Sequence, residues 1–328
     1  MEIIINTFGT SIHCEQNCFV IKNKDGTQKI PAEGVHSIQL GKGIFISSDA
    51  ILLAIENEID VVFTKRSGEP LGRVWSPKFG SISTIRKGQI NFAQSKDATE
   101  WVKGIIVKKI ENQQAMISMI PTKDFAQTNQ VKKAIARLDE YADKVRKIEG
   151  ESVTEFAQQL RGWEGVSSKI YFEVISLLVD DKYKFAKRSQ RPAYDIFNAL
   201  LNYGYGILYG KIEGALIKSG IDPYIGIFHR DEYNRPVLVY DMIEIFRIWI
   251  DYVVWNIISQ DIMTQEFYSV RSDGSYWLEN LGRRVIIQAV NDYLEEQVKI
   301  KGMDRSRSTH ILLYAQDLAQ LFKKYQNV

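Results

Sequence analysis

The pattern of the chain changes across the stretch Ser76-Pro77-Lys78-Phe79-Gly80-Ser81-Ile82-Ser83-Thr84-Ile85-Arg86-Lys87-Gly88-Gln89, which holds Pro77, Gly80 and Gly88 among polar residues. Before it, the apolar residues stand in short β-branched runs; after it, they recur at the spacing of three and four that marks one face of an α-helix. We place a domain boundary here, between residues 1–85 and 86–328. The sequence predicts an α+β protein, with a small N-terminal β-rich domain followed by a larger all-helical domain.

Five runs in the N-terminal part are typical of strands. They are Ile3–Ile5, Cys18–Ile21, Ser37–Leu40, Asp60–Phe63 and Arg73–Trp75. Asp25–Gly26 and Ser67–Pro70 are turn signals between them. Ser48 and Asp49 precede a helical pattern over residues 50–56, which predicts one helix within this domain.

Seven longer helices are predicted beyond the boundary from the apolar spacing. They cover residues 97–120, 129–148, 152–180, 193–219, 238–262, 277–300 and 308–326. The glycines 204, 206 and 210 do not follow a strand, so we interpret them as allowing close helix packing, with Tyr203 and Tyr205 at a cleft, and not as a dinucleotide-binding motif.

Composition limits the function. The 328 residues are 45% hydrophobic and 25% charged, which is typical of a folded globular protein, and the net charge is only +2. Any nucleic-acid contact must therefore come from a local basic patch. Cys14 and Cys18 are the only cysteines and with His13 offer at most three zinc ligands, so neither a disulfide framework nor a zinc site is expected.

Two segments bear on where the protein is found in the cell: the first residues and the longest apolar run. Residues 1–6 lack the pattern of a secretory signal. The run from Val237 to Ile258 contains four charged residues, which do not suit a membrane span. The sequence predicts a cytoplasmic protein with no membrane contact.

An acid pair follows a histidine in the second half of the chain. Asp241 and Glu244 are three residues apart, which on a helix places both carboxylates on one face, and His229 stands shortly before them. This arrangement indicates a metal site. The alternative for the pair is a solvated stripe in which Arg247 pairs with Asp251, and the alternative for His229 is a core histidine.

A third acid, Glu164, lies between Gly162 and Gly165 in a helical pattern. Such glycines suggest that a backbone or a ligand comes close, whereas the alternative is a helix break or tight packing with Glu164 facing water. Taken together, Glu164, His229 and Glu244, with Asp241 alongside, form an oxygen-rich set with one imidazole. That set favours Mg²⁺ or Mn²⁺ and suits chemistry on a phosphodiester.

A candidate nucleic-acid segment lies between Glu164 and His229. Residues 182–192 interleave basic and aromatic side chains, a combination that suits phosphates and stacked bases, although a lone charge run is also compatible with a solvated loop. The nucleic-acid-binding candidates are Lys184, Lys187, Arg188, Arg191, Asn198 and Tyr203. We find no Ser-His-Asp or Cys-His order and no phosphate-binding loop of the G-x-x-x-x-G-K-[ST] type.

Four strings in this order resemble the motifs of the CRISPR-associated integrase that acquires spacers, the Cas-one family. They are Arg161-Gly162-Trp163-Glu164-Gly165, the run from Gln190 to Gly206, Gly226-Ile227-Phe228-His229 and the run from Tyr240 to Arg247. The resemblance spans essentially the whole chain. It departs from the family at Ile227-Phe228, Ile245 and Ala193, and none of these removes a proposed ligand.

The resemblance implies a metal-dependent DNA endonuclease and integrase that inserts short duplexes into a repeat array. It implies that Glu164, His229 and Glu244 hold the ion, that Asp241 has a supporting role, and that residues 86–328 are the catalytic domain. It also implies a homodimer, for which we expect the β-rich domain to provide the surface, and a small partner protein, Cas-two. The expected reaction is attack by a 3′-hydroxyl of the incoming DNA, which requires no reactive serine or cysteine. A non-catalytic DNA-binding scaffold and a repair nuclease for branched DNA are the alternatives.

Overall fold

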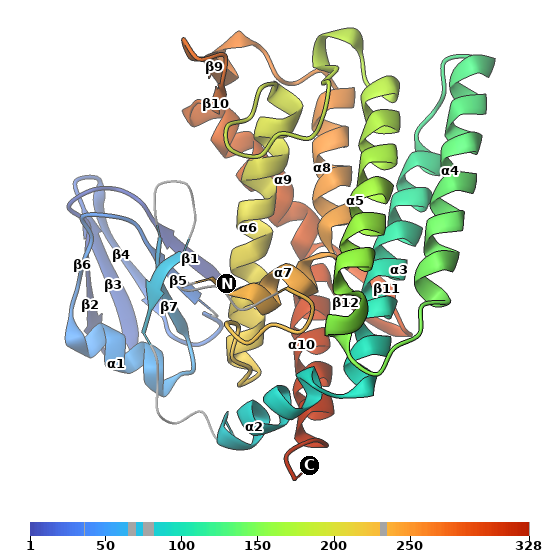
Figure 1. Ribbon diagram of the computed structural model, residues 1–328. Helices are drawn as coiled ribbons and strands as arrows, with labels where there is room; N and C mark the ends of the chain where they lie inside the picture. The colour runs from blue at the N-terminus through green and yellow to red at the C-terminus, as the bar shows by residue number, and fades with distance from the viewer. Residues whose placement is uncertain (36, 65–69, 75–81, 230–234, 328) are drawn as a thin grey trace. The chain divides into compact units, whose positions relative to one another are not determined.

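The computed structural model describes residues 1–35, 37–64, 70–74, 82–229 and 235–327. The chain divides into two compact units, Met1–Gly80 and Ser81–Val328, whereas the sequence placed the boundary after residue 85. A β-rich part is followed by a mostly helical part, which confirms the predicted fold class (Figure 1). The predicted turn at residues 67–69 and the predicted strand residue 75 lie outside the described residues.

The N-terminal unit holds two four-stranded sheets and one helix. The first sheet has the order β1-β5-β7-β8 and the second the order β4-β3-β2-β6. The elements are β1 (Glu2–Ile5), β2 (Ser11–Glu15), β3 (Cys18–Asn23), β4 (Gly26–Pro31), β5 (Ser37–Leu40), β6 (Phe45–Ile46), α1 (Ser48–Glu56), β7 (Asp60–Thr64) and β8 (Pro70–Arg73). Strands β2, β4 and β6 were not predicted, because β4 is largely polar and exposed and β6 has only two residues.

This unit has its own hydrophobic core, in which Phe19, Ile38 and Ala50 are almost fully buried. The predicted helix is confirmed, although Ser47 and not Ser48 caps it by accepting a hydrogen bond from the backbone of Ala50. The turn predicted at Asp25–Gly26 joins β3 to β4, and Gly26 has the positive φ that favours glycine.

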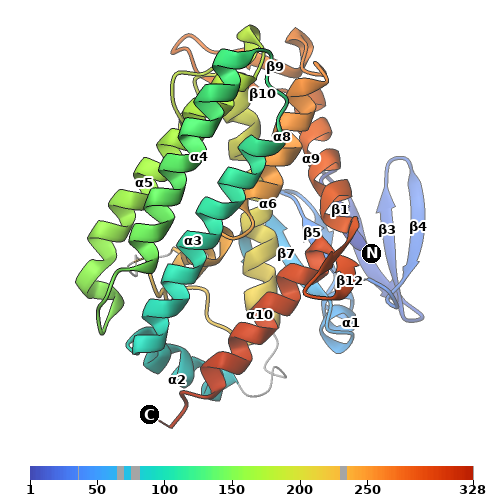
Figure 2. The same cartoon turned by 90° about the vertical axis from the view of Figure 1, so that its right-hand side faces the viewer.

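The helical unit contains nine α-helices among the described residues. They are α2 (Ile82–Ala93), α3 (Lys96–Met119), α4 (Phe125–Arg146), α5 (Val153–Leu178), α6 (Ile196–Lys218), α7 (Val237–Ile243), α8 (Arg247–Ser259), α9 (Asn280–Glu295) and α10 (Arg307–Lys323). Figures 1 and 2 show α3, α4 and α5 running side by side, and α6 lying against α7, α8, α9 and α10. Among the described residues no helix is long and apolar enough to cross a membrane.

The expectation of an all-helical domain needs a correction, because two short hairpins belong to this unit. They are β9 (Tyr268–Val270) with β10 (Tyr276–Leu278) and β11 (Gln297–Ile300) with β12 (Met303–Ser306). Residues 297–300 were predicted as the end of a helix. They form β11 and pair with β12 instead. Four residues are too few for the spacing of apolar side chains to distinguish a strand from a helix.

Helix α6 comes close to α8 at a glycine. A Cβ on Gly204 would stand 2.6 Å from Cγ2 of Ile250, which confirms that this glycine permits close helix packing. Tyr205, which was expected at a cleft, is buried in the same interface. The expectation for Tyr205 was therefore wrong, because its side chain points into the helical bundle, where its hydroxyl donates to Asp251.

The helix predicted over residues 238–262 is broken into α7 and α8 at residues 244–246. The side-chain amide of Asn112, on α3, donates a hydrogen bond of 3.0 Å to the carbonyl oxygen of Ile245 at this break. The backbone N–H of Phe246 donates to Ile243, a tight turn that ends α7. Glu244 is the C-cap residue of α7, directly at the break.

Candidate metal centre

Glu164 is presented by the unbroken helix α5, whose start is fixed by a capping box between Ser152 and Glu155. A Cβ added to Gly162 or Gly165 would meet no atom within 4 Å. Close approach of a protein backbone, a helix break and tight packing are therefore all wrong for these glycines, whereas close approach of a ligand stays a prediction. The glycines instead leave open space on α5 beside Glu164.

The side chain of Glu244 is only 11% exposed and lies between two cations. The guanidinium of Arg247 donates a hydrogen bond of 2.9 Å from Nε to Oε1 of Glu244, and the ammonium of Lys109 is 2.6 Å from Oε2. Burial by itself raises the pKa of Glu244, but the charges of Arg247 and Lys109 outweigh this effect and lower the pKa to about 2. Glu244 is therefore ionised near neutral pH.

Lys109, on α3, also donates a short hydrogen bond to Oε1 of Glu164, so that one ammonium bridges the two glutamates. The lysine is only 7% exposed. Burial lowers its pKa, but Glu244 and Glu164 outweigh burial and the net effect is a raised pKa. The lysine therefore carries its charge inside the bundle.

His229 is held by Asp241. The fully buried carboxylate of Asp241 accepts backbone hydrogen bonds from Ile227, Phe228 and His229 at 2.8 to 3.0 Å, and its Oδ1 lies 2.6 Å from Nδ1 of His229. A carboxylate only accepts, so in the neutral imidazole Nδ1 carries the proton and Nε2 keeps its lone pair. Asp241 thus fixes both the loop and the ring, and Nε2 lies on the side of the ring away from this carboxylate.

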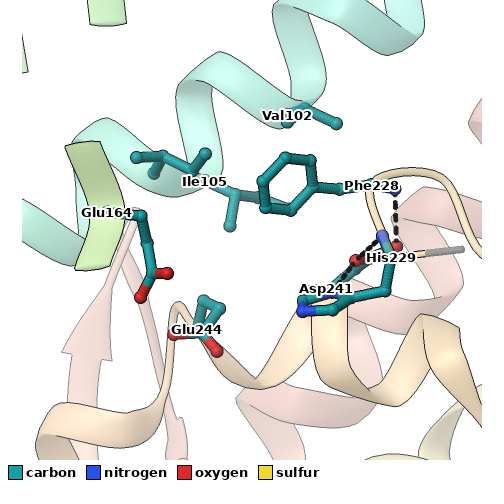
Figure 3. A pocket seen from close by; sticks show the side chains of 8 residues that line it. Val102, Ile105, Glu164, Phe228, His229, Asp241 and Glu244 are labelled. Atoms are coloured by element: carbon teal, nitrogen blue, oxygen red, sulfur yellow. Dashed lines mark hydrogen bonds and ion pairs between the residues drawn. The ribbon is translucent and has the colours of Figure 1, made fainter. Parts of the chain in front are cut away.

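These side chains line one small cavity of about 20 Å³, shared with apolar residues of α3. Its lining residues are Val102, Ile105, Ile106, Glu164, Phe228, His229, Asp241 and Glu244. Figure 3 shows Glu164 and Glu244 directed toward each other from different elements, and His229 joined to Asp241 by dashed lines. The volume suits a single small ion or a water molecule.

The donor set fits a hard divalent cation on two observations. First, a cation already stands between the two carboxylates, namely the ammonium of Lys109. Second, Oε2 of Glu244 is buried and forms no aligned hydrogen bond, although the Lys109 ammonium lies close to it. Among the described residues no three His, Cys, Asp or Glu side chains stand close enough together to hold an ion as they are. A divalent ion can therefore bind to Glu164, Glu244 and His229 only if the ammonium of Lys109 moves out from between the two glutamates.

The chain matches the family model described as CRISPR associated protein Cas1 over residues 3–292. The chain belongs to the Cas1 family. This confirms the resemblance seen in the four motifs. One relative is the CRISPR-associated endonuclease Cas1 1 of Archaeoglobus fulgidus, which is 30% identical over 335 residues, or 98% of this chain and 96% of the relative.

Solved structures share the fold of this family member. A casposase bound to integration product has a TM-score of 0.78 and 21% identity, and the match covers 98% of this chain and 90% of the casposase. A Cas6-RT-Cas1–Cas2 complex has a TM-score of 0.78 and 22% identity, and the match covers all of this chain and 35% of the other one.

The sequence analysis did not single out two cations that contact Glu244 in the structure. Lys109 looked like one of many helical lysines, and only the packing of α3 against α5 and α7 brings it to both glutamates. Arg247 was weighed as a partner of Asp251 at a spacing of four; instead it pairs with Glu244 at a spacing of three. Its other hydrogen bond, 3.0 Å, goes to the hydroxyl of Tyr209. No local pattern distinguishes these choices, since both spacings lie on one helical face.

The basic segment of this Cas1 family member begins beyond the end of α5 at Leu178, fourteen residues after Glu164, which is about 21 Å along the helix at 1.5 Å per residue. The segment then returns along α5, since Phe185 contacts Phe172. Arg188 lies over the ring of Tyr205, which the guanidinium of Arg247 also faces. Lys184, Lys187 and Arg191 are exposed, and Lys184 forms an ion pair with Asp181.

Three other nucleic-acid candidates point inward. Arg188 donates to the side-chain oxygens of Asn198 and Asn202 at 2.8 and 2.6 Å, and its guanidinium lies over the ring of Tyr205. Asn198 is fully buried and Tyr203 is partly buried. Arg188 and Asn198 thus hold the segment in shape, and the Asn198 side chain is not accessible to DNA in this arrangement.

Proposed function

We propose that this protein is a divalent-metal-dependent DNA endonuclease and integrase of CRISPR adaptation. It inserts short duplex DNA into a repeat array, where a 3′-hydroxyl of the incoming DNA attacks a phosphodiester of the repeat. The observation that carries the proposal is the convergence of Glu164, Glu244 and the unprotonated edge of His229 on one cavity, in a chain of the Cas1 family. The relative from Archaeoglobus fulgidus is named an endonuclease, and the casposase of similar fold was solved with an integration product.

Glu164, Glu244 and His229 would hold Mg²⁺ or Mn²⁺, whose oxygen-rich preference the two carboxylates meet. When bound, the ion would polarise the phosphodiester and offset the charge that develops during displacement. Asp241 keeps the ring of His229 oriented and its Nδ1 protonated. The nucleophile comes from the DNA, so the protein supplies positioning and charge and no reactive hydroxyl or thiol of its own.

The partners follow from the same proposal. Double-stranded DNA, both the incoming duplex and the repeat array, would contact the exposed cations Lys184, Lys187 and Arg191. A second copy of the chain and the small protein Cas2 would bring two such sites to the two ends of one duplex. Cas2 is part of the complex that contains a chain of similar fold. A protein with this substrate would work in the cytoplasm.

The test is strand transfer of a labelled short duplex with free 3′-hydroxyls into a repeat-bearing plasmid, with the small partner added. His229→Ala and EDTA should each lower joined product by at least about a hundredfold, because both remove the ion or one of its ligands. His13→Ala, the same change in strand β2, is the matched control and should react like the wild type.

Other outcomes separate the alternatives. Cleavage of branched DNA without joining would favour the repair nuclease. DNA binding without any turnover, unchanged by His229→Ala, would favour the non-catalytic scaffold.

A further inference from the structure

One buried cation has no part in the function proposed above. The ammonium of Lys109 contacts Oε1 of Glu164 and lies 2.6 Å from Oε2 of Glu244, so it stands between two of the three proposed ligands. The side chain is only 9% exposed, and it enters from α3 while the glutamates come from α5 and from the end of α7. Lys109 is distant from both glutamates in the sequence, so the packing of the helices brings its ammonium between them.

The charges around the two glutamates are already balanced. Two carboxylates, Glu164 and Glu244, face two cations, Lys109 and Arg247. A divalent ion entering beside both cations would leave a buried excess of positive charge, which is unfavourable in a medium of low dielectric constant. Binding of the ion therefore requires that one cation withdraws.

Lys109 is the cation that can withdraw. Arg247 is fixed by a hydrogen bond to the hydroxyl of Tyr209 and by the ring of Tyr205, 4.8 Å from its guanidinium. The contact of Lys109 with Glu244 lacks hydrogen-bond alignment, since Oε2 of Glu244 has no aligned partner. Lysine also carries its charge as a compact ammonium on a flexible stem, whereas the guanidinium of arginine is a rigid planar fork.

We propose that Lys109 is a positioning residue that occupies the place of the metal ion between Glu164 and Glu244, and that it weakens metal binding by competing for the same two carboxylates. This inference rests on the proposed metal site. In the metal-free protein the lysine keeps the two buried carboxylates from repelling each other. In the loaded protein the ion takes over that role.

Binding of Mn²⁺ to the full-length protein, measured by titration calorimetry without DNA, tests the proposal. Lys109→Met removes the charge and keeps the length of the side chain, so it should bind Mn²⁺ at least about tenfold more tightly than the wild type. Lys108→Met is the matched control on the same helix, because Lys108 is exposed and pairs with Glu111, and it should stay within about twofold of the wild type.

Thermal unfolding gives a second readout that does not depend on activity. Without metal, Lys109→Met should melt below the wild type, because two carboxylates are left without their shared cation. Mn²⁺ should then raise its Tm by more than it raises that of the wild type. Lys109→Gln, which keeps a hydrogen-bond donor without the charge, serves if the methionine variant does not fold, and Lys109→Arg should retain weak binding.

Glu164→Gln distinguishes failure of the Lys109 proposal from failure of the proposed metal site. If the wild type binds Mn²⁺, Glu164→Gln abolishes binding, and the neutral Lys109 variants bind no more tightly than the wild type, the competition is refuted while the metal site stands. If Glu164→Gln binds as the wild type does, the metal site itself is refuted and the role of Lys109 falls with it.

Discussion

Two acidic sites of the helical unit differ in the groups that contact their carboxylates. In the metal-centre cluster, Glu164 and Glu244 share the ammonium of Lys109 and face a cavity. In the second, the Asp251 cluster, the carboxylate of Asp251 accepts hydrogen bonds from the hydroxyls of Tyr171, at 2.9 Å, and Tyr205. Cations surround the first pair of acids, whereas neutral hydroxyls directly satisfy both oxygens of the second.

The difference is visible in the pKa values. Burial raises the pKa of Asp251, and the hydrogen bonds from the two tyrosines do not cancel that effect. Burial also acts on Glu244, but Arg247 and Lys109 outweigh it and the pKa falls to about 2. A buried carboxylate therefore does not by itself mark a functional site. A buried oxygen without an aligned hydrogen bond, beside a cavity and close to cations, is the better indicator.

The largest effect on stability is expected in the Asp251 cluster. Asp251→Ala leaves the buried hydroxyls of Tyr171 and Tyr205 without acceptors, which should lower the free energy of unfolding by about 3–5 kcal/mol. Denaturant unfolding measures this. The same protein, assayed at low temperature where it is folded, should keep strand-transfer activity. A loss of activity in the folded variant would contradict the division between the two clusters.

The pH dependence of stability should have opposite signs in the two clusters. The folded-state pKa of Glu244 is lowered, from 4.5 to about 2, so its contribution is present above pH 4.5 and is lost as the pH falls toward 2. The change is on the order of 3 kcal/mol at 1.36 kcal/mol per pKa unit. The folded-state pKa of Asp251 is raised, so its contribution is present below its unfolded value and is lost as the pH rises through the folded value.

Urea unfolding from pH 2 to 6 checks both signs. Relative to the wild type, Glu244→Gln should flatten the fall in stability below pH 4.5. Asp251→Asn should remove the loss of stability that occurs as the pH rises above 3.8, the ordinary pKa of this aspartate. Equal slopes in all three proteins would show that these carboxylates do not differ as described.

A smaller effect, this time on activity, is expected at the residue that orients His229. Asp241→Asn replaces an acceptor of the Nδ1 proton by a group that also donates, so His229 loses its fixed tautomer. Strand transfer should fall about 10–100-fold, in line with the loss of other groups that orient metal-binding histidines. Asp251→Asn is the control and should change the rate by less than about threefold.

The smallest effects are expected at two glycines, one beside each cluster. Gly204→Ala would press on Ile250 and should lower the free energy of unfolding by about 1–3 kcal/mol. Gly165→Ala meets open space and should stabilise α5 by less than about 1 kcal/mol, since alanine favours a helix. Melting curves of the two variants give the comparison, and a destabilising Gly165→Ala would show that the surface beside Glu164 is not open.

The sequence by itself determined the order of a β-rich and a mostly helical part, since apolar periods of two and of three to four are local properties of the chain. It also named Glu164, His229, Asp241 and Glu244, because their motifs stand in a fixed order. Their placement around one cavity is what the folded chain added.

Only the tertiary structure decided what each residue does there. It broke the predicted helix at residues 244–246, and it gave Asp241 the backbone N–H groups of residues 227–229 as partners, while Asp241 and Glu244 both line the cavity. It brought Lys109 from α3 to both glutamates, and it turned Arg188 of the basic segment toward Asn198 and Asn202 of α6. The contacts at Lys109 and at the helix break join segments about 50 to 140 residues apart in the sequence. The spacing of residues within one segment does not reveal such contacts.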